Sequence, residues 1–154
     1  MHDHKPYLVH YIISFVVRSG YRHDQLWDKP ALRRTTPLHY AASSYSFEWH
    51  SLVHELFQIY NRYDDNYDDK SGLTHLHVAC IYGCEEAVEK FLEFGQDSNC
   101  IWRKTGESPM HLALACDHAT ITRLLLENRA DPNLAHTQGM TALHIISQKK
   151  YDND

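Results

Sequence analysis

Apolar residues recur along this chain in short groups that are separated by polar, turn-forming residues. Phe91 and Leu92 follow Val88 by three and four residues, the spacing that places side chains on one face of a helix. The next group predicts a second helix of the same kind and comprises Ile121, Leu124, Leu125 and Leu126. Helices this short are marginal when isolated in water, where about 12–15 residues are needed. Each helix must therefore bury its apolar face against a neighbouring one.

One seven-residue motif occurs four times. Each copy begins with Thr or Ser and has His at its fourth position. The copies start at nearly regular intervals, at Thr36, Thr74, Ser108 and Thr141. The gaps contain the Asp-x-Asn triplets 64–66, 97–99 and 131–133, and the glycines Gly72, Gly106 and Gly139 stand two residues before a motif. Self-similarity at a nearly fixed period indicates a repeat architecture.

The residue types of the motif predict a helix that starts after its first position. A Thr or Ser hydroxyl caps a helix by accepting a backbone N–H, and Pro fits the next position because no N–H is needed there. Thr36-Pro37 and Ser108-Pro109 have this form. The Asp-x-Asn and Gly positions favour tight turns. Each unit is therefore predicted to be a helix pair with a turn, stacked on the next unit as in a solenoid.

The repeat resembles the ankyrin repeat in its Thr-Pro-Leu-His motif, its following alanines and its Asp-x-Asn hairpin. The resemblance covers residues 30–148 and implies an all-α solenoid of stacked helix-turn-helix units joined by β-hairpin-like loops. We expect one domain that comprises an N-terminal half-repeat or cap (1–30), a repeat with an insertion (31–67), two repeats (68–101 and 102–135) and a truncated repeat (136–154). We also expect one row of equivalent core contacts from Leu38, Leu76, Met110 and Leu143.

Three departures from the family pattern lead to structural expectations. About five extra residues within 43–51 predict a longer loop or an extended helix. Asp117 and Arg129 stand where the family usually has Gly, which is costly if the backbone needs a positive φ. The last unit lacks a second helix, so we expect part of the preceding apolar face (Leu125, Leu126) to stay uncovered. That predicts a fragment of a longer array, as in an adaptor or effector, or a chain that self-associates or frays at this end.

The apolar stretch at residues 7–17 predicts a helix that ends near Gly20. It resembles the second helix of a repeat and would cap the first complete unit. The alternative is a cleaved signal peptide, because Lys5 precedes the stretch and Val17 and Ser19 fit a cleavage site. The stretch is too short to span a bilayer, which takes about 20 residues.

The recurring histidines are the first candidates for chemistry. The fourth position of the motif is His in every copy (His39, His77, His111 and His144). The resemblance implies that each of these histidines ties the start of its helix to neighbouring backbone. Zinc binding is the alternative for His77, Cys80 and Cys84, whose spacing puts them on one helical face, although no fourth ligand is indicated. The sequence has no Gly-rich phosphate loop and no recognisable nucleophile motif. We therefore expect no enzyme activity, no metal and no cofactor.

Charge and cysteine content narrow the class of partner. The chain has 15 Lys and Arg against 20 Asp and Glu, a net charge of −5 with neutral His. Nonspecific nucleic-acid binding and docking to anionic lipid both need a basic face, so we expect neither nucleic acid nor a membrane as partner. Four cysteines are too few for a disulfide scaffold at this length. That favours reduced thiols and a cytoplasmic or nuclear location.

The resemblance implies a protein-binding module that uses the hairpin tips and the concave face formed by the first helices. The repeat sets the buried positions, so the positions that it leaves free are the candidates. Aligning the units predicts these protein-binding residues: Asp68, Lys70, Leu73, Ile81, Tyr82, Trp102, Lys104, Glu107, Cys116 and Met140. We expect Ile81, Tyr82 and Trp102 to be exposed anchors of a hot spot, flanked by Leu73 and Met140. The alternative is that Trp102 packs along its own hairpin and Tyr82 covers a neighbouring helix.

The sequence is also compatible with other functions. The acidic run at residues 64–69 is either a solvated hairpin tip or a contact for a basic partner. A structural spacer or a self-associating solenoid segment is one alternative to an interaction module, and an ankyrin-type inhibitor of a signalling or transcription factor is another. The scaffold does not identify the partner, because family members share it and differ in their surface.

Overall fold

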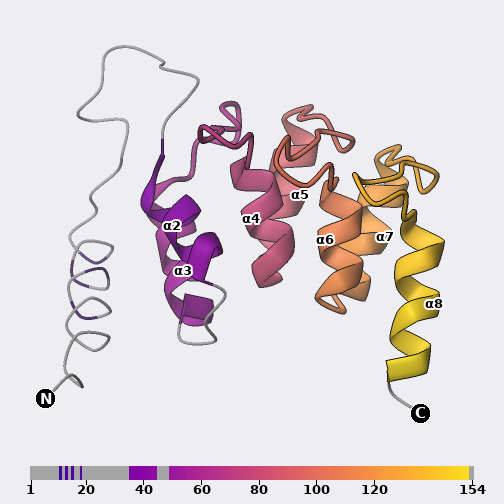
Figure 1. Cartoon of the computed structure of the whole chain (residues 1–154). Helices are drawn as coiled ribbons and strands as arrows, with labels where there is room; N and C mark the ends of the chain where they lie inside the picture. Colours follow the sequence, from indigo (N-terminus) through magenta and orange to yellow (C-terminus); the bar gives the residue numbers. More distant parts are fainter. Residues whose placement is uncertain are drawn as a thin grey trace, which may run out of the picture.

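Short helices follow one another along the whole length of the described chain (Figure 1). The computed structural model describes residues 35–44 and 49–152, together with the helical residues 11, 13, 15 and 18. Its helices are α2 (Pro37–Ser44), α3 (Trp49–Ile59), α4 (His75–Tyr82), α5 (Glu85–Glu93), α6 (Pro109–Ala115), α7 (Ala119–Glu127) and α8 (Ala142–Asp152). Among the described residues, β-structure is limited to two isolated bridges.

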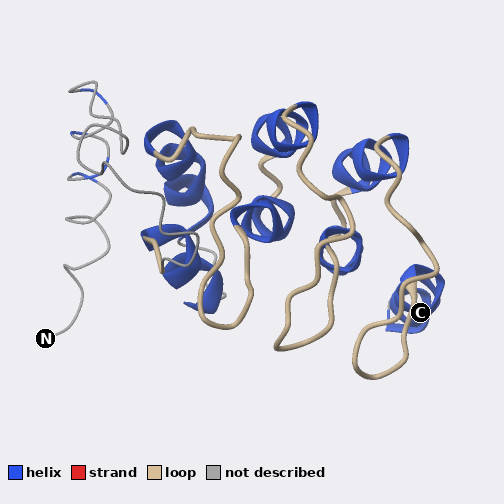
Figure 2. Cartoon of the chain, turned by 90° about the horizontal axis from the view of Figure 1, so that it is seen from above, coloured by secondary structure: helices blue, strands red, loops and turns tan. Residues whose placement is uncertain are grey.

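The helices form two layers (Figure 2). Helices α2, α4, α6 and α8 form the inner row, and α3, α5 and α7 form the outer row. Each inner helix contacts the next helix in its row, and α5 contacts α7 in the outer row. The long loops before α4, α6 and α8 project on the inner side. The prediction of an all-α solenoid of stacked units is therefore confirmed.

The inner helices start where the motif predicts, because its first and fourth residues cap them. At α4 the Thr74 hydroxyl accepts the His77 backbone N–H, and the Thr74 N–H donates to Nδ1 of His77 at 3.1 Å. At α6 the Ser108 N–H donates to Nδ1 of His111 at the same distance, 3.1 Å, and Pro109 occupies the first turn. The imidazole thus accepts a backbone N–H that has no partner within the helix.

The third residue of the motif contributes to the centre of the core. Leu38, Leu76 and Met110 are all buried at this position, as expected. Leu143 occupies the same position in the last copy, yet it is 70% exposed. The expected row of four equivalent core contacts is therefore wrong for Leu143. The reason is that no further unit packs on α8 within residues 35–44 and 49–152.

The apolar faces predicted for the outer helices are largely buried, including Val88, Phe91, Leu92, Ile121 and Leu125. The expectation that Leu125 stays uncovered is wrong. Leu126 is the uncovered residue, with 49% exposure. Leu92 stands at the same repeat position one unit earlier and is buried, because α5 packs against the following outer helix.

Two residues with a side chain occupy positions where the preceding unit has glycine. Asp117 and Arg129 have positive φ angles of 61° and 66°. Gly83 and Gly95 stand at the same positions of the preceding unit and have φ angles of 70° and 79°. The repeat therefore imposes the left-handed conformation on both, at a cost of about 1–2 kcal/mol for each residue. The positive φ that was expected from the sequence to be costly is therefore present at both residues.

Some expected features lie outside the described residues. One is the N-terminal segment that was predicted to be a cap or a signal peptide, of which only four helical positions are described. The other is residues 45–48 of the insertion. The part of the insertion that is described contributes to a longer helix, since α3 has 11 residues where α5 and α7 have 9. Within the described ranges, every helix is too short or too polar to cross a membrane. The expected domain boundaries stay predictions.

Gly106→Ala is expected to destabilise the fold by about 1 kcal/mol more than Gly139→Ala, because overpacking costs about 1–3 kcal/mol. The two glycines lie in equivalent hairpins and have nearly the same φ, 75° and 77°, so the backbone strain is matched. A Cβ at Gly106 would stand 2.7 Å from the backbone nitrogen of Thr137, whereas one at Gly139 would meet nothing within 4 Å. Urea unfolding followed by circular dichroism measures both losses, and equal losses would contradict close stacking of the hairpins.

Candidate protein-binding surface

The motif histidines join each inner helix to the loop of the next unit. In His39, His77 and His111, Nε2 donates a hydrogen bond to a backbone carbonyl 23–29 residues later in the chain, at 3.2–3.3 Å. Nδ1 of each ring accepts a backbone N–H at the start of its own helix, so Nε2 is the protonated nitrogen. His144 makes the same helix-start contact. The structural role implied by the resemblance is confirmed for the first three rings.

Burial keeps these imidazoles neutral. It lowers the pKa of His77 to about 4 and also lowers the pKa values of His39 and His111 below the ordinary 6.5. The hydrogen bonds to carbonyl groups act in the opposite direction but do not overcome the burial. A neutral ring is what the contacts require, because Nδ1 must accept while Nε2 donates.

The inner side carries three stacked hairpin loops, which span residues 68–74, 102–107 and 136–140. Backbone hydrogen bonds join each loop to the next. The Lys104 N–H donates to the Ser71 carbonyl at 3.2 Å, and the Thr137 N–H donates to the Thr105 carbonyl at 3.1 Å. The three hairpins therefore form one continuous row rather than three independent loops.

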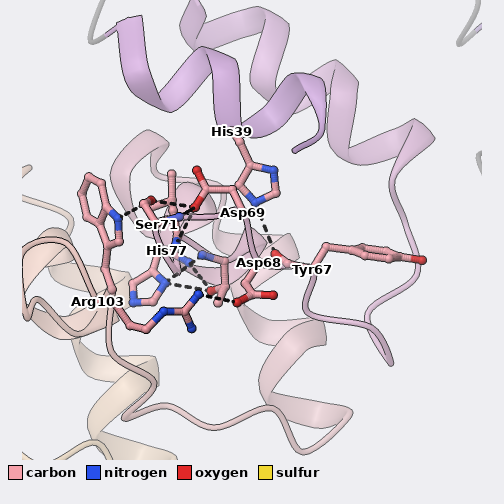
Figure 3. A network of polar contacts seen from close by, with 10 residues as sticks. His39, Tyr67, Asp68, Asp69, Ser71, His77 and Arg103 are labelled. Atoms are coloured by element: carbon pink, nitrogen blue, oxygen red, sulfur yellow. Dashed lines mark hydrogen bonds and ion pairs between the residues drawn. The ribbon is translucent and has the colours of Figure 1, made fainter. Parts of the chain in front are cut away.

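A polar network at the first hairpin engages both of its carboxylates (Figure 3). Oδ1 of Asp69 accepts the Ser71 hydroxyl at 2.6 Å and the backbone N–H groups of Ser71 and Leu73 at 2.8 and 3.1 Å. Burial alone would raise the pKa of Asp69, but these hydrogen bonds hold it below its ordinary value. Asp68 reaches the next hairpin instead, where it pairs with Arg103 at 3.1 Å.

Trp102 is not an exposed anchor. Its side chain is buried, and its indole N–H donates to the hydroxyl of Ser71 in the preceding hairpin at 2.8 Å. The prediction of exposure is therefore wrong, because the ring joins two hairpins. The alternative, packing along its own hairpin, does not account for this contact with the neighbouring one.

Leu73, Ile81 and Tyr82 are also buried, so their predicted exposure is wrong as well. The Tyr82 hydroxyl donates to the Ala41 carbonyl at 2.6 Å, and its ring meets His50 of α3 edge-on. Tyr82 thus covers neighbouring helices, which was the alternative considered from the sequence. Leu73 and Ile81 belong to the same hydrophobic core cluster. A hot spot needs side chains that a partner can bury, and these three are already buried within the chain.

The remaining predicted binding residues reach the surface to different degrees. Lys70, Lys104 and Cys116 are exposed, whereas Asp68, Glu107 and Met140 are half-buried. Met140 therefore meets its predicted exposure only in part. Cys116 follows the last residue of α6, at the other end of that helix from the hairpin tips. The ten residues do not form one patch, and their role in binding stays a prediction.

The acidic run at residues 64–69 is largely paired within the chain. Arg62 bridges Asp64 at 2.9 Å and Asp65 at 3.2 Å. The last two acids of the run take part in the hairpin network described above. The run therefore takes part in ion pairs and turn contacts within the chain while Asp64 stays 52% exposed, and a contact with a basic partner stays a prediction.

The contacts of the three residues considered for zinc do not favour a metal site. Both ring nitrogens of His77 already have protein partners. Cys80 is fully buried, and burial raises the pKa of Cys84 to about 12, which disfavours the thiolate that zinc needs. Within the described part of the chain, no three His, Cys, Asp or Glu side chains are arranged to hold a metal ion.

Arg103 and the bridging role of Ser71 were not predicted from the sequence. Arg103 is exposed and pairs with an acid 35 residues earlier. Ser71 accepts the indole N–H of Trp102, 31 residues later, and donates to Asp69. Contacts at such separations leave no local pattern in a single sequence. The only signal for them was the repeat alignment, which placed both residues within the hairpins.

Comparison with known proteins supports the repeat. A family model described as ankyrin repeats (3 copies) matches residues 4–101 and 38–136. The chain is 38% identical over 84 residues to the human BCL-6 corepressor-like protein 1 and 40% identical over 81 residues to the Neurogenic locus Notch protein of Drosophila melanogaster. It is 41% identical over 76 residues to the B-cell lymphoma 3 protein homolog of Mus musculus. In the order named, the three matches cover 54%, 52% and 49% of this chain. The chain itself spans only 5%, 3% and 17% of the length of these relatives.

Proposed function

Because the chain belongs to the ankyrin-repeat family, we propose that it is a non-enzymatic protein-interaction module whose partner lies against the hairpin tips and the inner row of helices. Ankyrin repeats generally mediate interactions between proteins. The proposal includes a role within an adaptor or effector and a cytoplasmic or nuclear location. The location is supported by the four cysteines, which are all free thiols.

The observation that carries the proposal is the continuous row of hairpins. Hydrogen bonds between adjacent hairpins hold Ser71 to Lys104 and Thr105 to Thr137, so the loops are organised before a partner arrives. Preorganisation reduces the conformational entropy that binding must overcome. Residues at the tips are mostly polar, and several of them, such as Lys70 and Lys104, are exposed where a partner can reach them.

Ala115→Arg is expected to reduce capture of the partner by at least about tenfold, or 1.4 kcal/mol. Ala115 is exposed at the end of α6 in the inner row, so a long cationic side chain there would obstruct a partner. Glu89→Arg adds the same side chain at an exposed position of α5 in the outer row and is expected to leave capture unchanged. The measurement is quantitative mass spectrometry of proteins retained by the immobilised wild-type chain and the two variants.

The capture experiment has two contradicting outcomes. Loss of the partner from Glu89→Arg but not from Ala115→Arg would place binding on the outer row. A wild-type chain that enriches no protein over an empty matrix would contradict the interaction module itself. Circular dichroism of both variants shows whether the fold is retained.

A second candidate function, self-association, is favoured by the exposed apolar residues at the C-terminal end. Leu126 and Ile146 are 49% and 51% exposed and line a groove of about 440 Å³ between α7 and α8. Exposed apolar patches mark interaction sites in soluble proteins. A concentration-dependent dimer in light scattering that is lost in Leu126→Asp would favour this function. No specific contact favours the roles of solenoid spacer or of inhibitor of a signalling or transcription factor.

A further inference from the structure

Three exposed cations lie in the first two hairpins: Lys70, Arg103 and Lys104, here called the tip ridge. Lys70 and Lys104 occupy the same position of successive repeats. The Lys104 N–H donates to the carbonyl of Ser71 at 3.2 Å, so the two tips lie side by side. Within the described residues, neither lysine forms an ion pair with a carboxylate.

The carboxylates of the same hairpins are less exposed than these cations, since Asp68, Asp69 and Glu107 are all half-buried. Oδ1 of Asp69 accepts hydrogen bonds from the Ser71 hydroxyl and the Leu73 backbone N–H (Figure 3). The side chain of Asp68 is 20% exposed, whereas that of its partner Arg103 is 52% exposed. A guanidinium has five N–H donors, so Arg103 keeps donors for a further acceptor. The tips therefore present positive charge to solvent although the chain as a whole carries a net charge of −5.

We propose that the tip ridge binds an acidic segment of a protein partner. The inference rests on the proposed function and specifies the chemistry of the partner, namely an extended segment whose carboxylates reach two adjacent hairpin tips. Complementary charges of this kind raise the association rate and fix the register of a complex. Nucleic-acid binding is not favoured, because it commonly neutralises about 6–10 phosphates, whereas the tip ridge holds three cations on an acidic protein.

The test uses the whole chain and a fluorescein-labelled peptide of eight glutamates, with binding followed by fluorescence anisotropy. The reversal variant Lys70→Glu/Lys104→Glu is expected to weaken peptide binding by at least about tenfold. Raising NaCl from about 20 mM to 200 mM is expected to weaken wild-type binding severalfold, because exposed charges are screened beyond the Debye length. An eight-residue Gly-Ser peptide and an eight-nucleotide oligothymidylate serve as comparison probes.

The matched control is Lys90→Glu/Arg123→Glu, which makes the same change in net charge on α5 and α7 of the outer row. It is expected to weaken binding by less than about twofold, since long-range repulsion is the only shared effect. Equal weakening in the two variants would overturn the proposal. Wild-type binding no tighter than that of the Gly-Ser peptide would overturn it too, as would a tip ridge that prefers the oligothymidylate.

Failure of this inference is distinguishable from failure of the proposed function. A partner that is captured by the wild-type chain, lost in Ala115→Arg and retained by Lys70→Glu/Lys104→Glu would leave the interaction module intact and remove the tip ridge from it. Thermal unfolding of both charge variants reports whether they fold. All four substituted side chains reach the surface, so folded proteins are expected.

Discussion

Replacing Leu76 with alanine is expected to lower the free energy of unfolding by about 2–5 kcal/mol. Leu76 is fully buried in α4, which contacts α2 and α6 in its own row and α3 and α5 in the outer row. Truncation removes apolar surface that is buried on folding and leaves a cavity that the surrounding helices fill only in part. The loss is expected to affect both neighbouring units, because stability in a stacked array depends on the interfaces between units.

The matched control is Leu143→Ala, which makes the same change at the same motif position. Leu143 is 70% exposed, so its truncation is expected to cost no more than about 0.5 kcal/mol. Urea unfolding followed by circular dichroism measures both variants against the wild-type chain. Similar losses for the two would show that the last copy of the motif is covered in solution, for example by a second copy of the chain.

Lowering the pH from about 6.5 to 4 is expected to remove about 3 kcal/mol of stability through His77 alone. The native pKa of this ring is about 4 because burial disfavours its charged form, whereas the unfolded value is near 6.5. In this window the unfolded chain binds a proton that the native chain does not. Stability therefore falls as the pH falls, and the loss from His77 levels off below its native pKa.

Other titratable groups bear on the same experiment. The pKa values of His39 and His111 are lowered chiefly by burial as well, so both add to the loss below pH 6.5. Asp69 acts at lower pH. Its hydrogen bonds hold its pKa below the ordinary 3.8, so its stabilising contribution is lost only as the pH falls below that ordinary value.

The measurement is the free energy of unfolding in urea at intervals between about pH 7.5 and 4. His77→Asn is expected to flatten the slope by up to about 1.4 kcal/mol per pH unit. Leu73→Ala is the control, since it removes a buried side chain without removing a titratable group and should keep the wild-type slope. An unchanged slope in His77→Asn would mean that the pKa of this ring is the same in the native and unfolded states.

The repeat, its helix starts and its turns could be predicted from the sequence because their contacts are local. The imidazole of His77 meets Thr74, three residues away. In the turns, the carboxylates of Asp97 and Asp131 accept the backbone N–H of the residue two positions later. Such contacts depend on residue types at fixed short spacings, which are visible in one sequence.

The exposure of the hairpin and inner-row residues could not be predicted in the same way. The Tyr82 hydroxyl bonds a carbonyl 41 residues earlier, and the Trp102 indole bonds a hydroxyl 31 residues earlier. Both contacts exist only because one unit stacks on another at a particular distance. The alignment of units identified these positions as free but did not show which neighbour each side chain meets.

By itself the sequence determined the repeating unit, including its helix starts, its turns and the apolar faces that had to be buried. It did so because hydrogen-bond caps and apolar spacing act within a single repeat unit. Only the tertiary structure decided which side chains reach solvent, because burial and ion pairing depend on the adjacent unit. Leucine at one motif position is buried at Leu76 and exposed at Leu143. For the same reason, Lys70 and Lys104 rather than Trp102 lie exposed in the hairpins.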